Sequence, residues 1–141
     1  MEEPIEPPGL SEDCYLRVVG GARILNAILA DLKKVLYEYN RLVKSSGYYL
    51  KPVHKVYKES RGLKRVYEYY GRYWWRLERR GGRVRYVYSG TVKPREVSLE
   101  PPSNPLEGLV VIREGEDVIV KCSDFEKFSG IFRGFKVVRE I

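Results

Sequence analysis

The stretch Tyr69–Gly90, YYGRYWWRLERRGGRVRYVYSG, constrains the fold more than any other part of the chain. It holds two runs rich in aromatic and β-branched residues, separated by Gly81 and Gly82. A Gly-Gly pair between such runs is typical of a β-hairpin with a two-residue turn. The turn would fix the register and pair the residues as follows: Arg80 with Arg83, Arg79 with Val84, Glu78 with Arg85, Leu77 with Tyr86, Arg76 with Val87 and Trp75 with Tyr88.

Side chains alternate across a strand, so this hairpin has two faces of different chemistry. The apolar face is formed by Tyr73, Trp75, Leu77, Val84, Tyr86 and Tyr88. The basic face is formed by Arg72, Trp74, Arg76, Glu78, Arg83, Arg85 and Val87. We expect the apolar face to join the core and Trp74 to be exposed among arginines. The alternative is the reverse, with Trp74 buried beneath a helix and Trp75 exposed.

Positive charge is concentrated on this hairpin and its neighbours. The chain carries a net charge of +7, but the range 61–95 alone holds eleven Lys and Arg against two acids. The first 13 residues carry five acids among several prolines, which predicts a mobile acidic tail. Because the charge is local, it indicates a partner rather than a general aid to solubility.

A long amphipathic helix is predicted over residues 22–44. Its apolar stripe takes three positions per heptad, and Ser45, Ser46 and Gly47 provide a stop. A stripe this wide favours packing across a sheet. A second interpretation is a zipper-like homodimer contact through Leu25, Leu32 and Tyr39.

The remaining pattern predicts strands joined mostly by hairpins. Extended segments are expected near residues 14–19, 48–58 (with Pro52 at an edge or break), 63–70, 109–112 and 118–120, and a last strand within 130–141. Gly71 suggests a bend or bulge, Gly115 a turn, and 94–108 a long loop. Phe125 and Phe128 suggest one helical turn, with Ser123 or Asp124 near its cap. The fold class is therefore α+β, an antiparallel sheet of hairpins packed against one long helix, with residues 14–141 as a single domain.

Composition gives expectations about the location of this protein, the temperature of its source and the state of its cysteines. No run of about 18 apolar residues exists, so no membrane span is expected, and the acidic N-terminus predicts a cytoplasmic protein. With no glutamine, three asparagines and 32% charged residues, the chain resembles proteins from hot environments. Cys14 and Cys122 are expected to be buried thiols. If the source is hot, a disulfide between them becomes an alternative.

The familiar catalytic and metal-binding motifs are missing. The sequence has no P-loop, HExxH, CxxC or GxSxG pattern, and its acids are scattered. His54 is the only histidine, and it is expected to be structural or exposed rather than catalytic. We therefore expect a protein that is not an enzyme and that uses no metal and no cofactor.

Basic residues interleaved with aromatics are what the sequence does offer. Eleven of its eighteen aromatic residues fall between Tyr48 and Tyr88. Proteins that hold single strands need positive charge for phosphates and flat rings for bases. We therefore expect a single-stranded DNA- or RNA-binding protein. Its predicted binding residues are Lys64, Arg65, Tyr70, Arg72, Trp74, Arg76, Arg83 and Arg85.

In pairing a long leucine-rich helix with an aromatic, arginine-rich sheet, the chain resembles the ThermoDBP-related single-stranded DNA-binding proteins of archaea. The likeness is one of overall character across most of the chain. It implies a domain other than an OB-fold that holds single-stranded nucleic acid in a cleft of apolar rings flanked by charge. It also implies self-association through a helix. No residue role is transferred from the family.

Three other functions stay open at this stage. The arginines could contact duplex phosphates in a chromatin-type protein, with the hairpin in a groove. The basic face could instead recognise folded RNA in an RNA-processing or ribosome-associated factor. A nuclease or other enzyme with an unseen site is the third. Exposed rings favour single strands, because a duplex hides its base faces.

Overall fold

The computed structural model describes residues 14–140, so the predicted acidic tail, residues 1–13, lies outside the described part. The fold is α+β, as predicted: seven strands form an antiparallel sheet in the order β2-β3-β5-β6-β1-β7, and β4 pairs with β3. By their internal contacts the residues divide into two compact units. Within the described residues, the first comprises 14–25, Val56–Glu68 and 110–140, and the second Asn26–Lys55 and Tyr69–Leu109. A single domain over 14–141 stays a prediction.

The first unit contains the short strands of the sheet. Strand β6 (Asp117–Lys121) pairs with both β5 (Val110–Glu114) and β1 (Tyr15–Val18), and β1 also pairs with β7 (Val137–Glu140). The predicted hairpin turn is at Gly115, which has a positive φ of 60°. Helix α2 (Cys122–Phe128) follows β6, and Ser123 and Asp124 lie in its first turn, near the N-cap residue Lys121 as predicted, although no side chain makes a capping hydrogen bond.

Two features tie the strands of this unit together. Cys14 and Cys122 form a disulfide, with their Cα atoms 5.4 Å apart, so the expectation of buried thiols is wrong and the alternative holds. Arg17 on β1 forms ion pairs of 2.8–3.1 Å with Glu114, Asp117 and Glu140, which come from three other segments. Ion-pair networks of this kind are favoured at high temperature.

The second unit contains most of α1 (Ala22–Val43), which the sequence predicted to within one residue. The 3-10 turn η1 (Lys44–Ser46) ends it, and Gly47 follows in the left-handed conformation with a φ of 87°. The chain buries one stripe of α1, made of Leu25, Leu29, Leu32, Leu36, Tyr39 and Val43. A dimer contact through Leu25, Leu32 and Tyr39 is therefore wrong, because these side chains are buried within their own chain.

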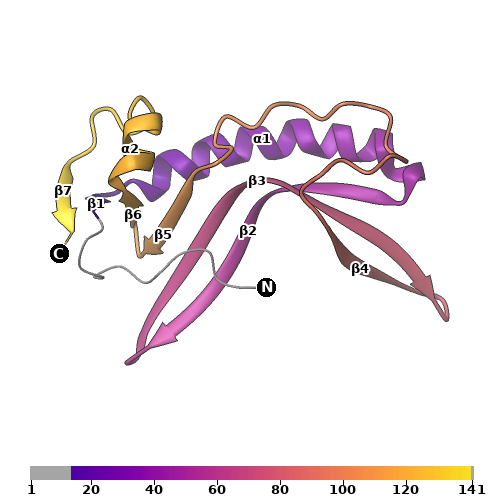
Figure 1. Cartoon of the computed structure of the whole chain (residues 1–141), viewed down its shortest axis with the longest axis horizontal. Helices are drawn as coiled ribbons and strands as arrows, with labels where there is room; N and C mark the ends of the chain where they lie inside the picture. The colour runs from indigo at the N-terminus through magenta and orange to yellow at the C-terminus, as the bar shows by residue number, and fades with distance from the viewer. Residues whose placement is uncertain (1–13, 141) are drawn as a thin grey trace. The chain divides into compact units, whose positions relative to one another are not determined.

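Strand β3 (Leu63–Arg80) is the longest element of the sheet. It pairs with β4 (Arg83–Gly90) in one hairpin, and β2 (Tyr48–Ser60) lies beside it in another (Figure 1). It runs unbroken through Gly71, whereas its pairing with β4 shifts between Trp74 and Trp75. The irregularity therefore lies opposite Ser89 of β4 and not at Gly71, where the sequence predicted it.

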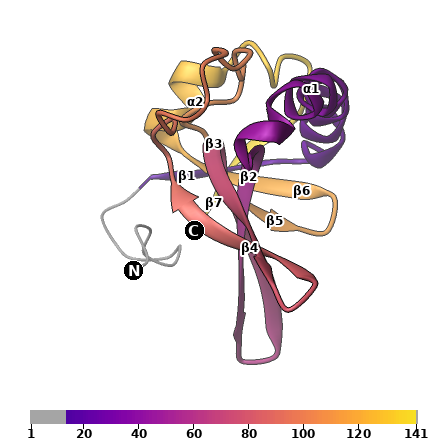
Figure 2. The same ribbon diagram turned by 90° about the vertical axis from the view of Figure 1, so that its right-hand side faces the viewer.

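The β3/β4 pairing confirms the predicted register from Arg80 opposite Arg83 to Trp75 opposite Tyr88. Gly81 and Gly82 both have positive φ, 53° and 80°, as a two-residue type I′ turn requires. Figure 2 shows β3 and β4 as a twisted ribbon closed by this turn. The chain after β4, predicted as a loop, returns along α1 (Figure 1), where Tyr39 donates a hydrogen bond of 2.5 Å to the Leu99 carbonyl.

Candidate functional site

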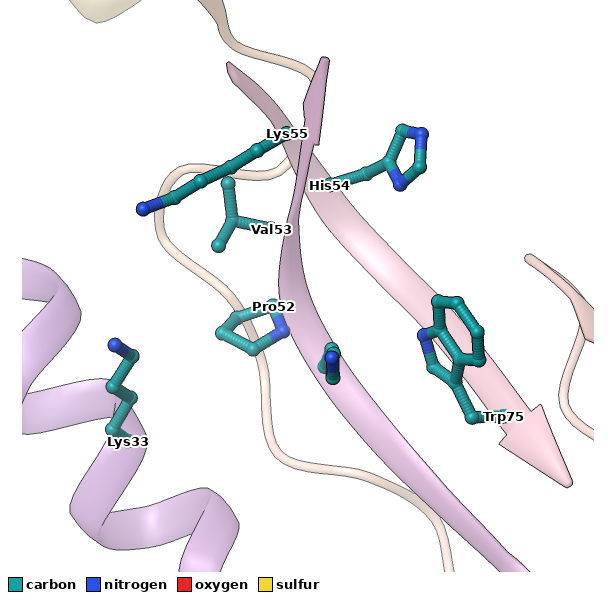
Figure 3. Close-up of a pocket in the computed structure, with 7 residues that line it drawn as sticks. Lys33, Pro52, Val53, His54, Lys55 and Trp75 are labelled. Atoms are coloured by element: carbon teal, nitrogen blue, oxygen red, sulfur yellow. The ribbon is translucent and has the colours of Figure 1, made fainter. Parts of the chain in front are cut away.

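Two hollows of the second unit lie between residues of α1 and residues of the hairpin strands. One, of about 470 Å³, is lined by Lys33 of α1, by the β2 residues Lys51, Pro52, Val53, His54 and Lys55, and by Trp75 of β3 (Figure 3). The other, of about 530 Å³, is lined by Tyr37, Asn40, Arg41, Lys44, Tyr49, Leu77 and Tyr86. We call the two together the groove.

Aromatic rings lie on the sheet side of the groove: Tyr49, His54, Trp75 and Tyr86 line it, and Tyr73 and Tyr88 contact these rings without lining either hollow. Ring centroids are 5.0 Å apart for Tyr49 and Tyr86 and 5.3 Å apart for Trp75 and Tyr88, both edge-on. His54 lies between Tyr73 and Tyr88, at 5.5 and 6.3 Å. We call this set the aromatic face: Tyr49, His54, Tyr73, Trp75, Tyr86 and Tyr88.

The aromatic face is open to solvent rather than part of the core. Tyr86 and Tyr88 are 56% and 44% exposed, and the Trp75 side chain is half-buried. Burial, together with the nearby Tyr88, raises the pKa of Tyr73, so its hydroxyl is neutral at physiological pH. The Trp75 Nε1 is covered, and no described residue accepts a hydrogen bond from it.

Cations line the groove, and none of its lining residues within 14–140 is a carboxylate. The Lys51 ammonium lies 5.0 Å from the Trp75 ring centroid and 5.8 Å from that of Tyr49, within cation–π range. The other four cations of the lining are Lys33, Lys55, Arg41 and Lys44.

Three of these cations, Lys33, Arg41 and Lys44, follow a simple helical periodicity. Residues 33, 37, 41 and 44 recur every three or four positions on α1 and so share one face of the helix. This face is separate from the buried leucine stripe. The groove thus combines rings for flat ligands with positive charge for anionic ones.

The predicted basic face of the β3/β4 hairpin exists and is exposed at its arginines. Arg76, Arg80, Arg83 and Arg85 share it with Glu78, because paired residues point to the same side. Arg76 forms an ion pair with Glu78. That hydrogen bond, aided by the charges of Arg85 and Arg80, lowers the pKa of Glu78, which therefore stays ionised.

The predicted sides of the two tryptophans are the wrong way round. Trp74 is 0% exposed and meets the Tyr39 ring of α1 edge-on at 6.3 Å between centroids. The expected core residues Tyr86 and Tyr88 are exposed instead. The physical reason is that Tyr39 of α1 meets Trp74 at the base of the hairpin, so the face of β3 that carries Trp74 is the buried one there. Further out, neither face of the ribbon is covered.

The other predicted binding residues do not gather in the groove. Tyr70 is buried, and Arg72 lies 3.5 Å from Glu107. Lys64 and Arg65 belong to the first unit, where Arg65 forms an ion pair with Glu114 at 2.6 Å. Of the eight predicted residues, none lines either hollow.

Sequence reasoning missed the five cations of the groove. The available signal was the basic and aromatic spacing on the outer side of α1, together with Lys51 and Lys55 beside Tyr49. The prediction for that helix used only its leucine periodicity. His54 was set aside as structural or exposed, and the structure places it on the aromatic face.

The chain matches no protein-family model, and it has no match among curated proteins or solved structures. The resemblance to the ThermoDBP-related proteins therefore stays a prediction. Within residues 14–140, no group of three or more His, Cys, Asp or Glu side chains is placed to hold a metal ion. Within the same residues, no helix is both long and apolar enough to cross a membrane.

Proposed function

We propose that this protein binds single-stranded nucleic acid, DNA or RNA, without catalysing a reaction. In this proposal an antiparallel sheet packed against α1 presents the aromatic face to the bases of the strand. The cations of the groove bind its phosphates. The observation that carries the proposal is the open aromatic face beside a groove that, in the described part of the chain, is lined by five cations and no acid.

The chemistry of the groove favours a single strand over a duplex. Each exposed ring can stack on an unpaired base, which contributes about 1–3 kcal/mol and does not depend strongly on base identity. Base pairs in a duplex keep their faces stacked and hidden. Lysines predominate among the groove cations, and lysine is a compact charge on a flexible stem that suits phosphates of variable position.

The test compares aromatic variants in a titration with a fluorescent single-stranded oligonucleotide. Tyr86→Ala removes an exposed ring of the aromatic face and should weaken binding by about 1–3 kcal/mol, or about 5- to 150-fold. Tyr57→Ala is the matched control, because Tyr57 is 72% exposed and belongs to the first unit. Equal losses for the two variants would refute the assignment of the site.

A charge series addresses the phosphate contacts separately. Lys33→Gln and Lys51→Gln should each weaken binding and reduce its dependence on salt, since each neutralised phosphate releases a counterion. Lys127→Gln, on an exposed lysine of α2, should change neither quantity. An affinity that stays flat between low and moderate salt would contradict the proposal as a whole.

A further inference from the structure

The outer end of the β3/β4 hairpin carries arginines that the groove does not use. Arg79, Arg80, Arg83 and Arg85 are all exposed, and within residues 14–140 no ion pair holds any of the four. Glu78 is the one acid on this part of the ribbon, and it is paired with Arg76. The end of the hairpin is thus a strongly positive surface with little internal compensation.

This arrangement has a cost for the fold. Arg80 lies directly opposite Arg83 in the antiparallel pair, and like charges in that position repel each other. The register places Arg85 opposite Glu78, in the next pair along the same face. A polyanion bound across this face would relieve the repulsion, which free solvent only screens.

The choice of cation differs between the two surfaces. Between Arg72 and Arg95 the chain has seven arginines and one lysine, whereas the groove is lined by four lysines and one arginine. Arginine presents a planar fork that binds a phosphate through two parallel hydrogen bonds. Its enrichment at the hairpin end favours phosphates held at fixed spacing, as on a duplex, over those of a flexible strand.

The dimensions of the ribbon agree with a duplex partner. Successive pairs on one face of the ribbon are about 7 Å apart, close to two base-pair steps along one strand of a duplex. A two-stranded β-ribbon also fits the major groove of B-form DNA. At that spacing the Arg80–Arg83 pair and Arg85 are placed to contact phosphates about two steps apart along the groove edge.

The two faces of the ribbon carry different binding chemistry. Trp75, Tyr86 and Tyr88 lie on one face, and Arg80, Arg83 and Arg85 on the other. About five residue steps, or about 17 Å, separate the Trp75–Tyr88 pair from the Arg80–Arg83 pair. A ligand that spans both surfaces needs unpaired bases and, within that distance, regularly spaced duplex phosphates.

We propose that the preferred partner of this protein is a junction between a single strand and a duplex. The aromatic face and groove bind the single strand, and Arg80, Arg83 and Arg85 bind the phosphates of the adjoining duplex. The single-strand half of this inference rests on the proposed function. The duplex half rests on the arginine face of the hairpin.

The test uses the full chain and three DNA probes: a single strand of about 15 nucleotides, a blunt duplex of about 15 base pairs, and the duplex carrying the single strand as a tail. We expect the tailed duplex to bind at least about tenfold more tightly than the single strand. The triple variant Arg80→Gln, Arg83→Gln, Arg85→Gln should lose this advantage and keep its affinity for the single strand. Its salt dependence on the tailed duplex should fall by up to about 0.9 per arginine in log–log slope.

The matched control is Lys121→Gln, Lys127→Gln, Arg133→Gln, which removes the same charge from exposed positions of the first unit. This control variant should still bind the tailed duplex about tenfold more tightly than the single strand. If the control also loses that advantage, the loss in the arginine variant is due to net charge, and the inference is overturned. Thermal melting of both triple variants checks that they fold.

The remaining outcomes separate this inference from the proposed function. A wild-type protein that binds the single strand but gains nothing from the duplex overturns the inference alone. If the arginine variant weakens both probes equally, the arginines belong to the single-strand site, which also overturns it. Failure to bind the single strand, with no effect of Tyr86→Ala on any probe, overturns the proposed function and the junction with it. Arginine-dependent binding to phosphatidylserine vesicles, without a duplex advantage, would identify a membrane partner instead.

Discussion

The two adjacent tryptophans of β3 should respond to mutation in opposite ways. Trp74 is fully buried against Tyr39, whereas Trp75 lines the groove and is half-buried. Replacing a buried Trp by Ala typically costs about 3–5 kcal/mol of unfolding free energy. The Trp74 Nε1 is buried without a hydrogen-bond acceptor among the described residues. Removing this donor relieves a penalty of about 1–3 kcal/mol, so the expected loss for Trp74→Ala lies at the lower end, about 3 kcal/mol.

For a chain of this size, 3 kcal/mol corresponds to a fall in melting temperature of about 12 °C. Trp74→Phe is the informative partner variant, because it keeps a large ring beside Tyr39 and removes the unpaired donor. It still removes part of a buried ring and leaves a small cavity, so we expect it to cost about 1–2 kcal/mol, less than Trp74→Ala. Both variants should bind a single-stranded oligonucleotide with nearly wild-type affinity at a temperature where they are folded.

Trp75→Ala should show the reverse pattern. Its half-buried ring is expected to contribute about 1–2 kcal/mol to stability, and its loss should weaken single-strand binding by about 1–3 kcal/mol. The measurements are thermal melting by circular dichroism and anisotropy titration with a labelled oligonucleotide. If Trp74→Ala melts like the wild type, or if Trp75→Ala alone unfolds the protein, the assignment of the two faces is refuted.

Three further outcomes are expected. Reduction of the Cys14–Cys122 disulfide, which closes a loop with a sequence separation of 108, should lower the unfolding free energy by up to about 4.7 kcal/mol, measured by urea denaturation with and without reductant. The pKa of Asp117 is lowered by the Gly20 amide and by Arg17. Burial acts to raise the pKa of Glu114, but the hydrogen bonds and charges of Arg17 and Arg65 together outweigh it and lower that pKa. Both folded pKa values lie below the unfolded values of about 4–4.5, so the two ionised carboxylates stabilise the fold fully above that pH. This stabilisation is lost as pH falls through the folded pKa values. The melting temperature, measured as a function of pH, should therefore decline only below about pH 4.5. Tyr88→Ala, at an exposed ring, should change the melting temperature by little and weaken single-strand binding, and unchanged affinity would remove Tyr88 from the aromatic face as a stacking platform.

Local pattern was enough to predict most of the fold. The leucine periodicity predicted α1, and the Gly81–Gly82 pair predicted the hairpin with its register. Both signals act over a few residues and depend on backbone geometry alone. These two signals therefore predict the same element whatever other part of the chain packs against it.

The side of the sheet that is buried could not be predicted in the same way. Alternation shows that Trp74 and Trp75 face opposite sides, but not which side α1 covers. Apolar content pointed to the face of Trp75, Tyr86 and Tyr88, since more apolar area is normally buried. At this hairpin the contact between Tyr39 of α1 and Trp74 determines which face is buried at the base.

The open ribbon explains why its turn matters for the arrangement of the binding surfaces. A strand register is strongly specified where one face is buried, because a slip of one residue would expose the core. The outer part of β3/β4 has no buried face, so the register there depends on the turn and on cross-strand pairs such as Trp75 with Tyr88. The positive φ of Gly81 and Gly82 holds the repelling Arg80 and Arg83 opposite each other. The two glycines therefore set the spacing between the arginines of one face and the rings of the other, and the junction inference depends on that spacing.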